Sequence, residues 1–314
     1  MQFFYPNFLR ANASSRKRIA LIFSLLFFSL VVNAQNTSAN SLDFDGSNDK
    51  VTIPDNNSLD MTSNYTLEVW IYPTQFIHLA GIVDKYQSPN SNGYMIRLDG
   101  TSGKMSFDER VTTNNVLTLN TWNHVAAVNS NGTRRLYVNG VEVALGSSSF
   151  NVIANGDPLC LGIDWNSASR SFKGRMDEVR VWNVARTATQ ISESMNRMMA
   201  GNETGLVAYY RFDQGTAGGA NTALTTLTNL ATATGSALNG TLSGFSLNNT
   251  ATSNWVTGYS GFWPLVSTTT ASSVLSSSAS SGGNVVHEGG GLCNAWRSME
   301  YYSRSNRFIK HKDQ

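Results

Sequence analysis

The chain has 314 residues and a formal net charge of +2 at pH 7, and charged residues make up only 14% of it. No basic stripe interleaves with aromatic residues, so nothing indicates a nucleic-acid-binding surface. The length suffices for one large domain or two smaller ones, each able to bury a core. Because Asn, Ser, Thr and Gly are abundant while charges are few, the composition is typical of an extracellular β protein.

The N-terminal residues have the pattern of a secretory signal peptide. A basic cluster at residues 16–18 precedes an apolar run at residues 19–32, and Val32-Asn33-Ala34 is a small-x-small cleavage site. A membrane anchor is the alternative, but a span needs roughly 20 apolar residues and this run is shorter. We therefore expect cleavage after Ala34, a secreted or cell-surface protein, and no membrane span in the mature chain.

Most of the sequence before Trp182 consists of short β-type segments separated by turn residues. In the clearest of them, residues 65–72, alternate side chains form one apolar face: Tyr65, Leu67, Val69 and Ile71. Further strands are expected at residues 93–98, 104–107, 122–128, 134–138, 141–143, 158–163 and 172–182. Asn139-Gly140 predicts a type I′ hairpin turn. Strands at intervals of roughly 8–12 residues predict an antiparallel two-sheet sandwich or jelly roll.

One helix is indicated, at residues 187–199. It begins with a Thr cap and has Ile191, Met195 and Met198 on one side. The expected fold class is therefore all-β, an antiparallel two-sheet jelly-roll sandwich with one short helix and a β extension.

The chain after this helix is expected to divide into three segments. Residues 201–260 form the β extension, with a strand at 205–213, a loop-like stretch at 224–247 and a closing strand at 254–256. Residues 261–286 are a Ser/Thr-rich linker or the start of a truncated β-repeat. Residues 287–314 lose the alternation of apolar and polar residues. We expect this tail to be disordered or to result from a misread C-terminal sequence, such as a frameshift.

The two cysteines are not expected to pair. Cys160 lies in an apolar strand and should be a buried small hydrophobe, whereas Cys293 lies in the C-terminal segment that departs from the β pattern. A domain of this length can bury an adequate core without a disulfide.

Several strings, in unbroken order, resemble the laminin G-like (concanavalin A-like lectin/glucanase) jelly roll of secreted proteins of Bacteroidetes type. They occupy residues 41–46 with 49–54, 65–73, 120–125, 136–140 and 172–186. The resemblance implies a laminin G-like domain over residues 35–200. It also implies a module of a larger, adhesin-like multi-domain surface protein that binds an extracellular glycan or protein ligand. A structural spacer without a ligand is the alternative.

Aspartates near the first hairpin and in the closing strand suggest a metal site. Ca²⁺ takes six to eight oxygen ligands from carboxylates, carbonyls and water. Because the first and last strands of a jelly roll are neighbours, Asp45, Asp49 and Asp177 could converge on a structural calcium ion, and the resemblance implies such sites in many members. The alternative is that these aspartates serve turns and salt bridges, for instance Asp177 with Arg175 or Arg180.

Ligand contacts are expected in loops at the rim of the sandwich or on its concave sheet. Trp165 lies in the polar stretch 162–167, where its ring could stack on a sugar. The predicted ligand residues are Asp84, Tyr86, Asp164, Trp165 and Asn166. The tryptophans within strands, Trp70, Trp122 and Trp182, are expected to be core or inter-sheet packing residues.

The sequence gives no sign of catalysis, although some proteins of this fold are glycoside hydrolases. Those enzymes need two carboxylates across the scissile bond, supplied on this fold by a strand of the Glu-x-Asp-x-x-Glu type. Glu68 and Glu178 each stand alone in an apolar strand, and pleating should send Glu178 and Asp177 to opposite faces. His124 is expected to be structural, and the histidines lack zinc-ligand spacing. We expect a non-enzyme, with a glycoside hydrolase as the alternative.

Overall fold

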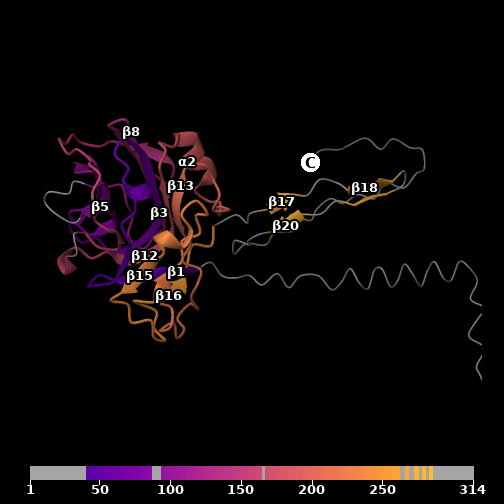
Figure 1. The fold of residues 1–314 in the computed structure, drawn as a ribbon. Coiled ribbons are helices and arrows are strands. Elements are labelled where there is room, and N and C mark those ends of the chain that lie inside the picture. The colour runs from indigo at the N-terminus through magenta and orange to yellow at the C-terminus, as the bar shows by residue number, and fades with distance from the viewer. Residues whose placement is uncertain are drawn as a thin grey trace, which may run out of the picture. The chain divides into compact units, whose positions relative to one another are not determined.

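The computed structural model describes residues 40–86, 93–164 and 167–261, together with four short strands beyond them. The predicted signal peptide, Trp165, Asn166 and residues 287–314 lie outside the described residues. Residues 40–261 form two eight-stranded antiparallel sheets, here named sheet A and sheet B (Figure 1). The four short strands make two further hairpin-like pairs: β17 (Val266–Thr268) with β20 (Gly283–Val285), and β18 (Ser272–Leu275) with β19 (Ser278–Ser280).

Sheet A has the order β10-β9-β8-β3-β12-β1-β16, and β13 also pairs with β12. Its strands are β1 (Asn40–Asp45), β3 (Asn64–Gln75), β8 (Asn123–Ser130), β9 (Thr133–Val138), β10 (Val141–Val143), β12 (Lys173–Trp182), β13 (Leu206–Tyr210) and β16 (Trp255–Thr257). Strands distant in the chain are neighbours in this order, as the predicted jelly roll requires.

Sheet B has the order β14-β15-β2-β11-β4-β5-β6-β7. Its strands are β2 (Lys50–Ile53), β4 (Gly81–Asp84), β5 (Met95–Asp99), β6 (Lys104–Phe107), β7 (Arg110–Val111), β11 (Leu159–Leu161), β14 (Thr226–Leu227) and β15 (Gly240–Ser243). Three short 3-10 helices lie in the connections: η1 (Asn57–Leu59), η2 (Ala168–Arg170) and η3 (Gly235–Leu238).

The core lies between the two sheets. The predicted apolar face of β3, from Tyr65 to Ile71, is fully buried there against residues of sheet B such as Ile96 and Leu161. Burying each such side chain contributes about 1.5–3 kcal/mol, so this face is a main stabilising element. The predicted hairpin turn is also confirmed, since Asn139 and Gly140 have φ values of 51° and 78°. Cys160 on β11 is buried, as predicted, while Cys293 lies outside the described residues.

Residues 201–260 are built into both sheets. β13 extends sheet A from β12, β16 pairs with β1, and β14 and β15 extend sheet B from β2. The expectation of a loop over residues 224–247 is therefore wrong in part. Gly240 shows why the glycine content wrongly indicated a loop. A Cβ at this position would lie 2.4 Å from Cγ1 of Val51, so glycine is needed for β15 to pack against β2.

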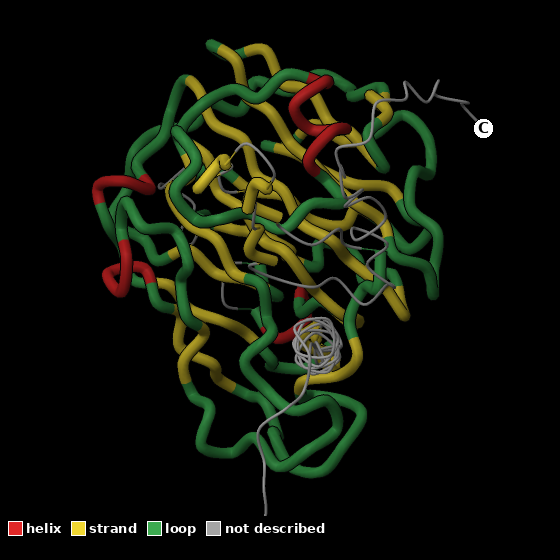
Figure 2. The backbone as a smooth tube through the Cα atoms, turned by 90° about the vertical axis from the view of Figure 1, so that its right-hand side faces the viewer, coloured by secondary structure: helices red, strands yellow, loops and turns green. Residues whose placement is uncertain are grey.

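The helix α2 (Ala188–Ser194) is shorter than predicted, although its start is as expected. Thr187 caps it and forms a capping box with Gln190. Ile191 packs on the outer face of sheet A, the face turned away from the core, and the helix covers this part of the sheet (Figures 1 and 2). Residues 195–199 lie beyond the helix, and the carbonyls of Ser194 and Arg197 accept from the Arg180 guanidinium. In the described part of the chain, no helix is long and apolar enough to cross a membrane.

Strand β12 contains a bulge that the alternation did not reveal. Glu178 has a φ of 51°, and the pairing of β12 with β3 shifts between Asp177 and Arg180. Both Asp177 and Glu178 therefore lie on the outer face of sheet A, while Val179 returns to the core. The prediction that Asp177 and Glu178 point to opposite faces is wrong for this reason.

Candidate functional site

The predicted calcium ligands are only partly brought together. Asp49 accepts hydrogen bonds through Oδ2 from the main-chain N–H of Asp45, at 2.9 Å, and through Oδ1 from the hydroxyl of Ser253, at 3.0 Å. β1 and β12 are neighbours as expected, but their register pairs Asp45 with Lys173. Asp177 lies four residues farther along β12, about 13 Å away at the usual strand rise.

The three carboxylates thus do not converge, and the predicted ligand set is corrected by the strand register. Among the described residues, no group of three or more His, Cys, Asp or Glu side chains is placed to hold a metal ion. Asp43 and Asp49 instead hold the segment around Ser253, and burial raises the pKa of each carboxyl to about 6. Asp177 accepts from the main-chain N–H of Tyr259 at 3.4 Å, and not from Arg175 or Arg180.

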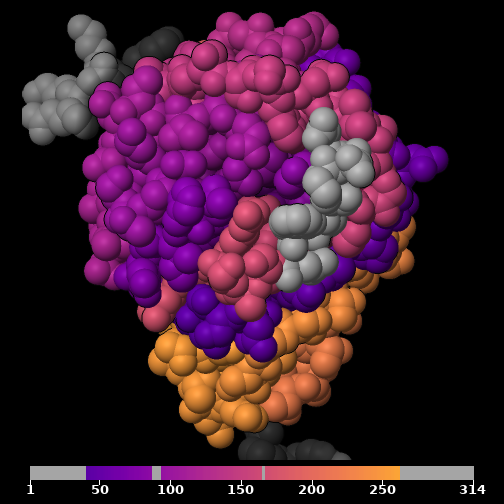
Figure 3. Space-filling model, turned by 90° about the vertical axis from the view of Figure 1, so that its left-hand side faces the viewer, coloured from indigo at the N-terminus to yellow at the C-terminus, as the bar shows by residue number. Residues whose placement is uncertain are grey.

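Two of the predicted ligand residues, Asp84 and Asp164, are fully buried. Asp84 ends β4 of sheet B, and Asp164 follows β11 of the same sheet. Figure 3 shows the surface of the molecule on the side where β5 of sheet B lies in Figure 1. Asp164 Oδ2 accepts from Arg97 at 3.2 Å and from Arg170 at 3.0 Å. Burial and the adjacent Asp164 hold the pKa of Asp84 well above its usual range. These two carboxyl groups fix the surrounding loops and offer no surface to a ligand. Tyr86 is partly exposed beside Phe150, while Trp165 and Asn166 lie outside the described residues.

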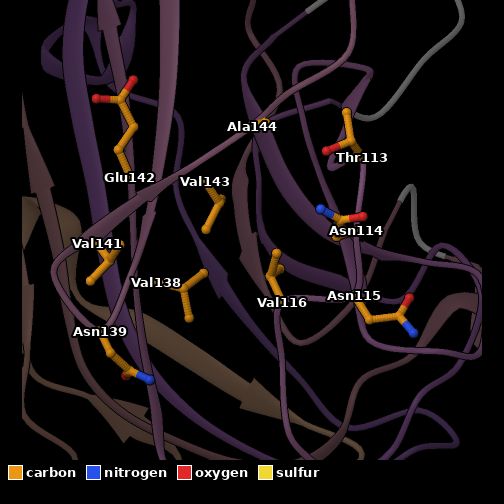
Figure 4. Close-up of a pocket in the computed structure, with 10 residues that line it drawn as sticks. All are labelled: Thr113, Asn114, Asn115, Val116, Val138, Asn139, Val141, Glu142, Val143 and Ala144. Atoms are coloured by element: carbon orange, nitrogen blue, oxygen red, sulfur yellow. The ribbon is translucent and has the colours of Figure 1, made fainter.

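An open groove of about 560 Å³ lies at one edge of the sandwich, between the β9–β10 hairpin and the segment after β7 (Figure 4). Val116, Val138 and Val143 lie between the two walls, and polar side chains such as Asn114 and Glu142 surround them. It is lined by Thr113, Asn114, Asn115, Val116, Val138, Asn139, Val141, Glu142, Val143 and Ala144. No aromatic ring lines it, so it offers no flat face for stacking.

A different surface crosses the outer face of sheet A. Asp43 on β1 pairs directly with Arg175 on β12, and Arg175 pairs directly with Tyr72 on β3. Directly paired residues share a face of the sheet. The ring of Trp122, which precedes β8, lies edge-on to Tyr72 with 5.6 Å between centroids. These four residues form one line across the sheet, here named the aromatic row.

The aromatic row combines partly exposed rings with a paired cation. Tyr72, Trp122 and Arg175 are all partly exposed. The Arg175 guanidinium carbon lies 5.2 Å from the centre of the Tyr72 ring, and Arg175 Nε lies 3.7 Å from Asp43 Oδ2. A cation at this distance from a ring is attracted by its π face, which restrains the guanidinium beside Tyr72. Flat apolar faces and directional donors therefore lie side by side.

A buried layer beside the row restrains it. Trp70 stacks on Tyr259 with ring centroids 4.0 Å apart, donates its indole N–H to the carbonyl of Met195 at 2.8 Å, and packs on Met198. Trp70 is thus a packing residue, as predicted, but on the outer face of sheet A and not between the sheets. Trp122 is only partly buried, contrary to the prediction. Trp182 is buried on the outer face beside Tyr209.

The two glutamates that could supply acid–base chemistry are both tied to cations. Glu68 is fully buried against Arg186, Arg180 and His124. Burial alone would raise the pKa of Glu68, but contact with His124 and the charges of both arginines outweigh it and lower the pKa to about 2. Glu178 is buried and accepts from Arg180 at 2.6 Å. Burial also lowers the pKa of His124, which favours its neutral, structural form.

A family model described as the concanavalin A-like lectin/glucanases superfamily, of laminin G type, matches residues 45–192. Among solved structures, a Bacteroides ovatus protein described as a candidate carbohydrate-binding protein is 25% identical, with a TM-score of 0.50. The alignment covers 66% of this chain and 58% of that one, so this chain spans little more than half of its length.

Two further solved structures are similar to part of the chain at lower identity. Domain 4 of AbnA, a GH43 extracellular arabinanase from Geobacillus stearothermophilus solved with arabinotriose, is 22% identical with a TM-score of 0.39, covering 49% of this chain and 75% of its own. Domains LG4-5 of the mouse laminin α1 chain are 18% identical with a TM-score of 0.36, covering 46% and 41%. No curated protein matches the sequence.

Proposed function

We propose that this chain is a non-catalytic module that binds an extracellular glycan through the aromatic row. Residues 45–192 belong to the concanavalin A-like lectin/glucanase superfamily, which supports this proposal. The observation that carries the proposal is the pair of partly exposed rings, Tyr72 and Trp122, beside the Arg175–Asp43 pair on one face of sheet A. The likeness to the Bacteroides ovatus protein supports a carbohydrate ligand.

The chemistry of a sugar ring fits this surface. One face of a pyranose is largely C–H and the periphery is hydroxyl, so it needs a flat apolar partner with polar groups beside it. Tyr72 and Trp122 supply large apolar faces. Arg175 has several N–H donors in a fixed plane, and the buried Asp43 carboxylate holds that guanidinium beside the ring. Because Asp43, Arg175 and Tyr72 stand on adjacent strands, little conformational entropy is lost when they bind.

The absence of catalysis is part of the proposal. A retaining glycosidase needs two carboxyl groups roughly 5–5.5 Å apart that face the substrate, one of them able to donate a proton. Glu68 and Glu178 are buried and paired with arginines, so neither faces a ligand. A glycoside hydrolase would release reducing sugar from polysaccharides, and we expect none.

Export, display on a larger adhesin-like protein and calcium dependence also belong to the proposal. The apolar segment at residues 19–32 supports export. Calcium binding at Asp45 and Asp49 remains a prediction, now without Asp177. Thermal unfolding of the mature chain with added calcium and with a chelator tests it: a higher Tm with calcium that is lost in Asp49→Asn supports the site.

The experiment for the ligand is a glycan array with the mature chain, followed by calorimetric titration of the best glycan. Trp122→Ala and Tyr72→Ala should each weaken binding about ten-fold or more, as loss of an aromatic anchor does. Val141→Ser in the groove is the matched control, because Val141 is 67% exposed and lies outside the row. Tyr86→Ala tests the rim. Loss of binding in Tyr86→Ala alone would show that the glycan binds at the rim loops of the sandwich and not at the aromatic row. If no glycan binds at all, the alternative of a structural spacer without a ligand is favoured.

A further inference from the structure

Lys85, directly after β4, has a buried ammonium group surrounded by oxygen atoms. Its side chain is 2% exposed. Nζ lies 2.7 Å from Asp55 Oδ1, 2.7 Å from the carbonyl of Asp157 and 2.9 Å from the carbonyl of Asn155. Asn155 Oδ1 at 3.3 Å and Asp60 Oδ1 at 3.5 Å complete the shell. We name these oxygens and their residues the Lys85 cage.

The cage offers more oxygen and more negative charge than an ammonium group can use. An ammonium has three N–H donors, whereas five oxygen atoms lie within 3.5 Å of Nζ. The carboxylates of Asp55 and Asp60 carry two formal negative charges against the single positive charge of Lys85. Asp60 Oδ1 meets Nζ only as an ion pair at 3.5 Å and accepts no hydrogen bond. The ammonium group therefore does not hydrogen-bond with every oxygen of the cage.

The walls of the cage are fixed by contacts that do not involve the ammonium. The side-chain N–H of Asn155 donates to the carbonyl of Lys85 at 3.2 Å, and Asn155 Oδ1 accepts from the main-chain N–H of Asp157 at 3.0 Å. The main-chain N–H of Lys85 donates to the carbonyl of Tyr94 at 3.0 Å. A Cβ on Gly93 would lie 2.2 Å from the carbonyl oxygen of Lys85, so the neighbouring strand packs directly on this backbone. The carbonyl oxygens of Asn155 and Asp157 and the amide oxygen of Asn155 should thus stay in place when the side chain is shortened.

Carboxylates, main-chain carbonyls and an amide oxygen converging from separate loops are the ligand set that Ca²⁺ takes, at 2.3–2.6 Å in flexible geometry. A divalent ion would also match the two carboxylate charges of Asp55 and Asp60. We propose that the Lys85 cage is a calcium site in which the lysine ammonium takes the place of the ion. Removing the side chain of Lys85 then opens the site to Ca²⁺. This inference does not depend on the proposed glycan site, which lies on sheet A.

The test compares three variants of the mature chain. Lys85→Ala empties the cage, Lys85→Met keeps the length of the side chain but fills the cage with apolar atoms, and Lys85→Ala with Asp55→Asn removes a ligand. Titration calorimetry should find one more Ca²⁺ ion bound by Lys85→Ala than by the natural chain, and no additional ion in the other two variants. Calcium should raise the Tm of Lys85→Ala by several degrees beyond any effect on the natural chain.

Equal calcium binding by Lys85→Ala, Lys85→Met and the natural chain would overturn the proposal. If Lys85→Ala does not fold alone, it is refolded with calcium, with magnesium or with a chelator. Recovery of the near-UV circular dichroism with calcium alone would support the site, because Mg²⁺ demands a smaller, octahedral shell. Failure to recover in calcium would overturn it.

Discussion

The buried guanidinium of Arg180 fastens helix α2 to sheet A. Its side chain is 1% exposed and donates to Glu178 Oε2 at 2.6 Å. It also donates to the carbonyl oxygens of Ser194, the last residue of the helix, and of Arg197, at 3.0 Å and 2.6 Å. Arg180→Met would keep much of the apolar stem while leaving the Glu178 carboxylate and both carbonyls without this donor.

The magnitude follows from what remains around Glu178. Removing one partner of a buried ion pair costs about 3–5 kcal/mol, because the other charge stays buried. Glu178 keeps the hydroxyl of Tyr209 at 2.8 Å and Arg211 at 3.6 Å, so we expect the lower end, about 3 kcal/mol. For a domain of this size, each kcal/mol lowers the Tm by roughly 2–4 °C. The expected fall is therefore about 6–12 °C.

Thermal and urea unfolding of the mature chain measure this loss, and Arg135→Met is the matched control. The Arg135–Glu142 pair is 3.6 Å long, with both side chains largely exposed, so its removal should cost about 0–1 kcal/mol. Hydrogen exchange in α2 should rise in Arg180→Met and stay unchanged in Arg135→Met. Equal losses of stability in the two variants would refute the role assigned to Arg180.

Two further outcomes test the fold. Gly240→Val should destabilise the domain by about 1–3 kcal/mol in urea unfolding, since the new side chain would enter the space of Val51; an unchanged midpoint would contradict the packing of β15 on β2. The pKa values of Asp43 and Asp49, raised from 3.8 to about 6, predict a stability contribution that is fully present below pH 3.8 and lost as pH rises through about 6. Glu68, whose pKa falls from 4.5 to about 2, contributes above pH 4.5 and loses this contribution as pH falls towards 2. Between pH 5 and 7.5 the Glu68 contribution hardly changes, so the unfolding free energy should fall over this range as Asp43 and Asp49 ionise in the folded state, and Asp43→Asn should reduce that fall.

The sequence predicted the elements whose signals are local. Strand β3 was predictable because its alternate residues, from Tyr65 to Ile71, are apolar and do enter the core. The turn at Asn139-Gly140 was predictable because these residues favour positive φ. The end of α2 was not, since the segment around it is held by Arg180 from the distant strand β12, a contact that no local pattern displays. Strand β15 was also not predictable from composition, because Gly240 is required there for close packing against Val51 and does not mark a loop.

The candidate sites depend on register, which the sequence does not display. The pairing of Asp45 with Lys173 separates Asp177 from the first hairpin, although β1 and β12 are neighbours as expected. The register of β12 with β3 places Arg175 beside Tyr72 and so creates the aromatic row. Sequence alone offers one usable signal for it, the position of Tyr72 on the face of β3 opposite to its core residues.

The Lys85 cage depends on three separate segments of the chain. The regions after β2, after β4 and before β11 each contribute, and no spacing in the sequence links them. A lone lysine at the end of an apolar strand is ordinarily a solvent-exposed residue, so its burial could be found only from the folded structure.

The central claim is that the aromatic row binds a glycan, and the most direct measurement is the affinity of the best array glycan for the natural chain, Trp122→Ala and Val141→Ser. We predict a loss of about ten-fold or more in Trp122→Ala and no change in Val141→Ser, with both variants melting close to the natural chain. Full affinity in a folded Trp122→Ala variant would contradict the account.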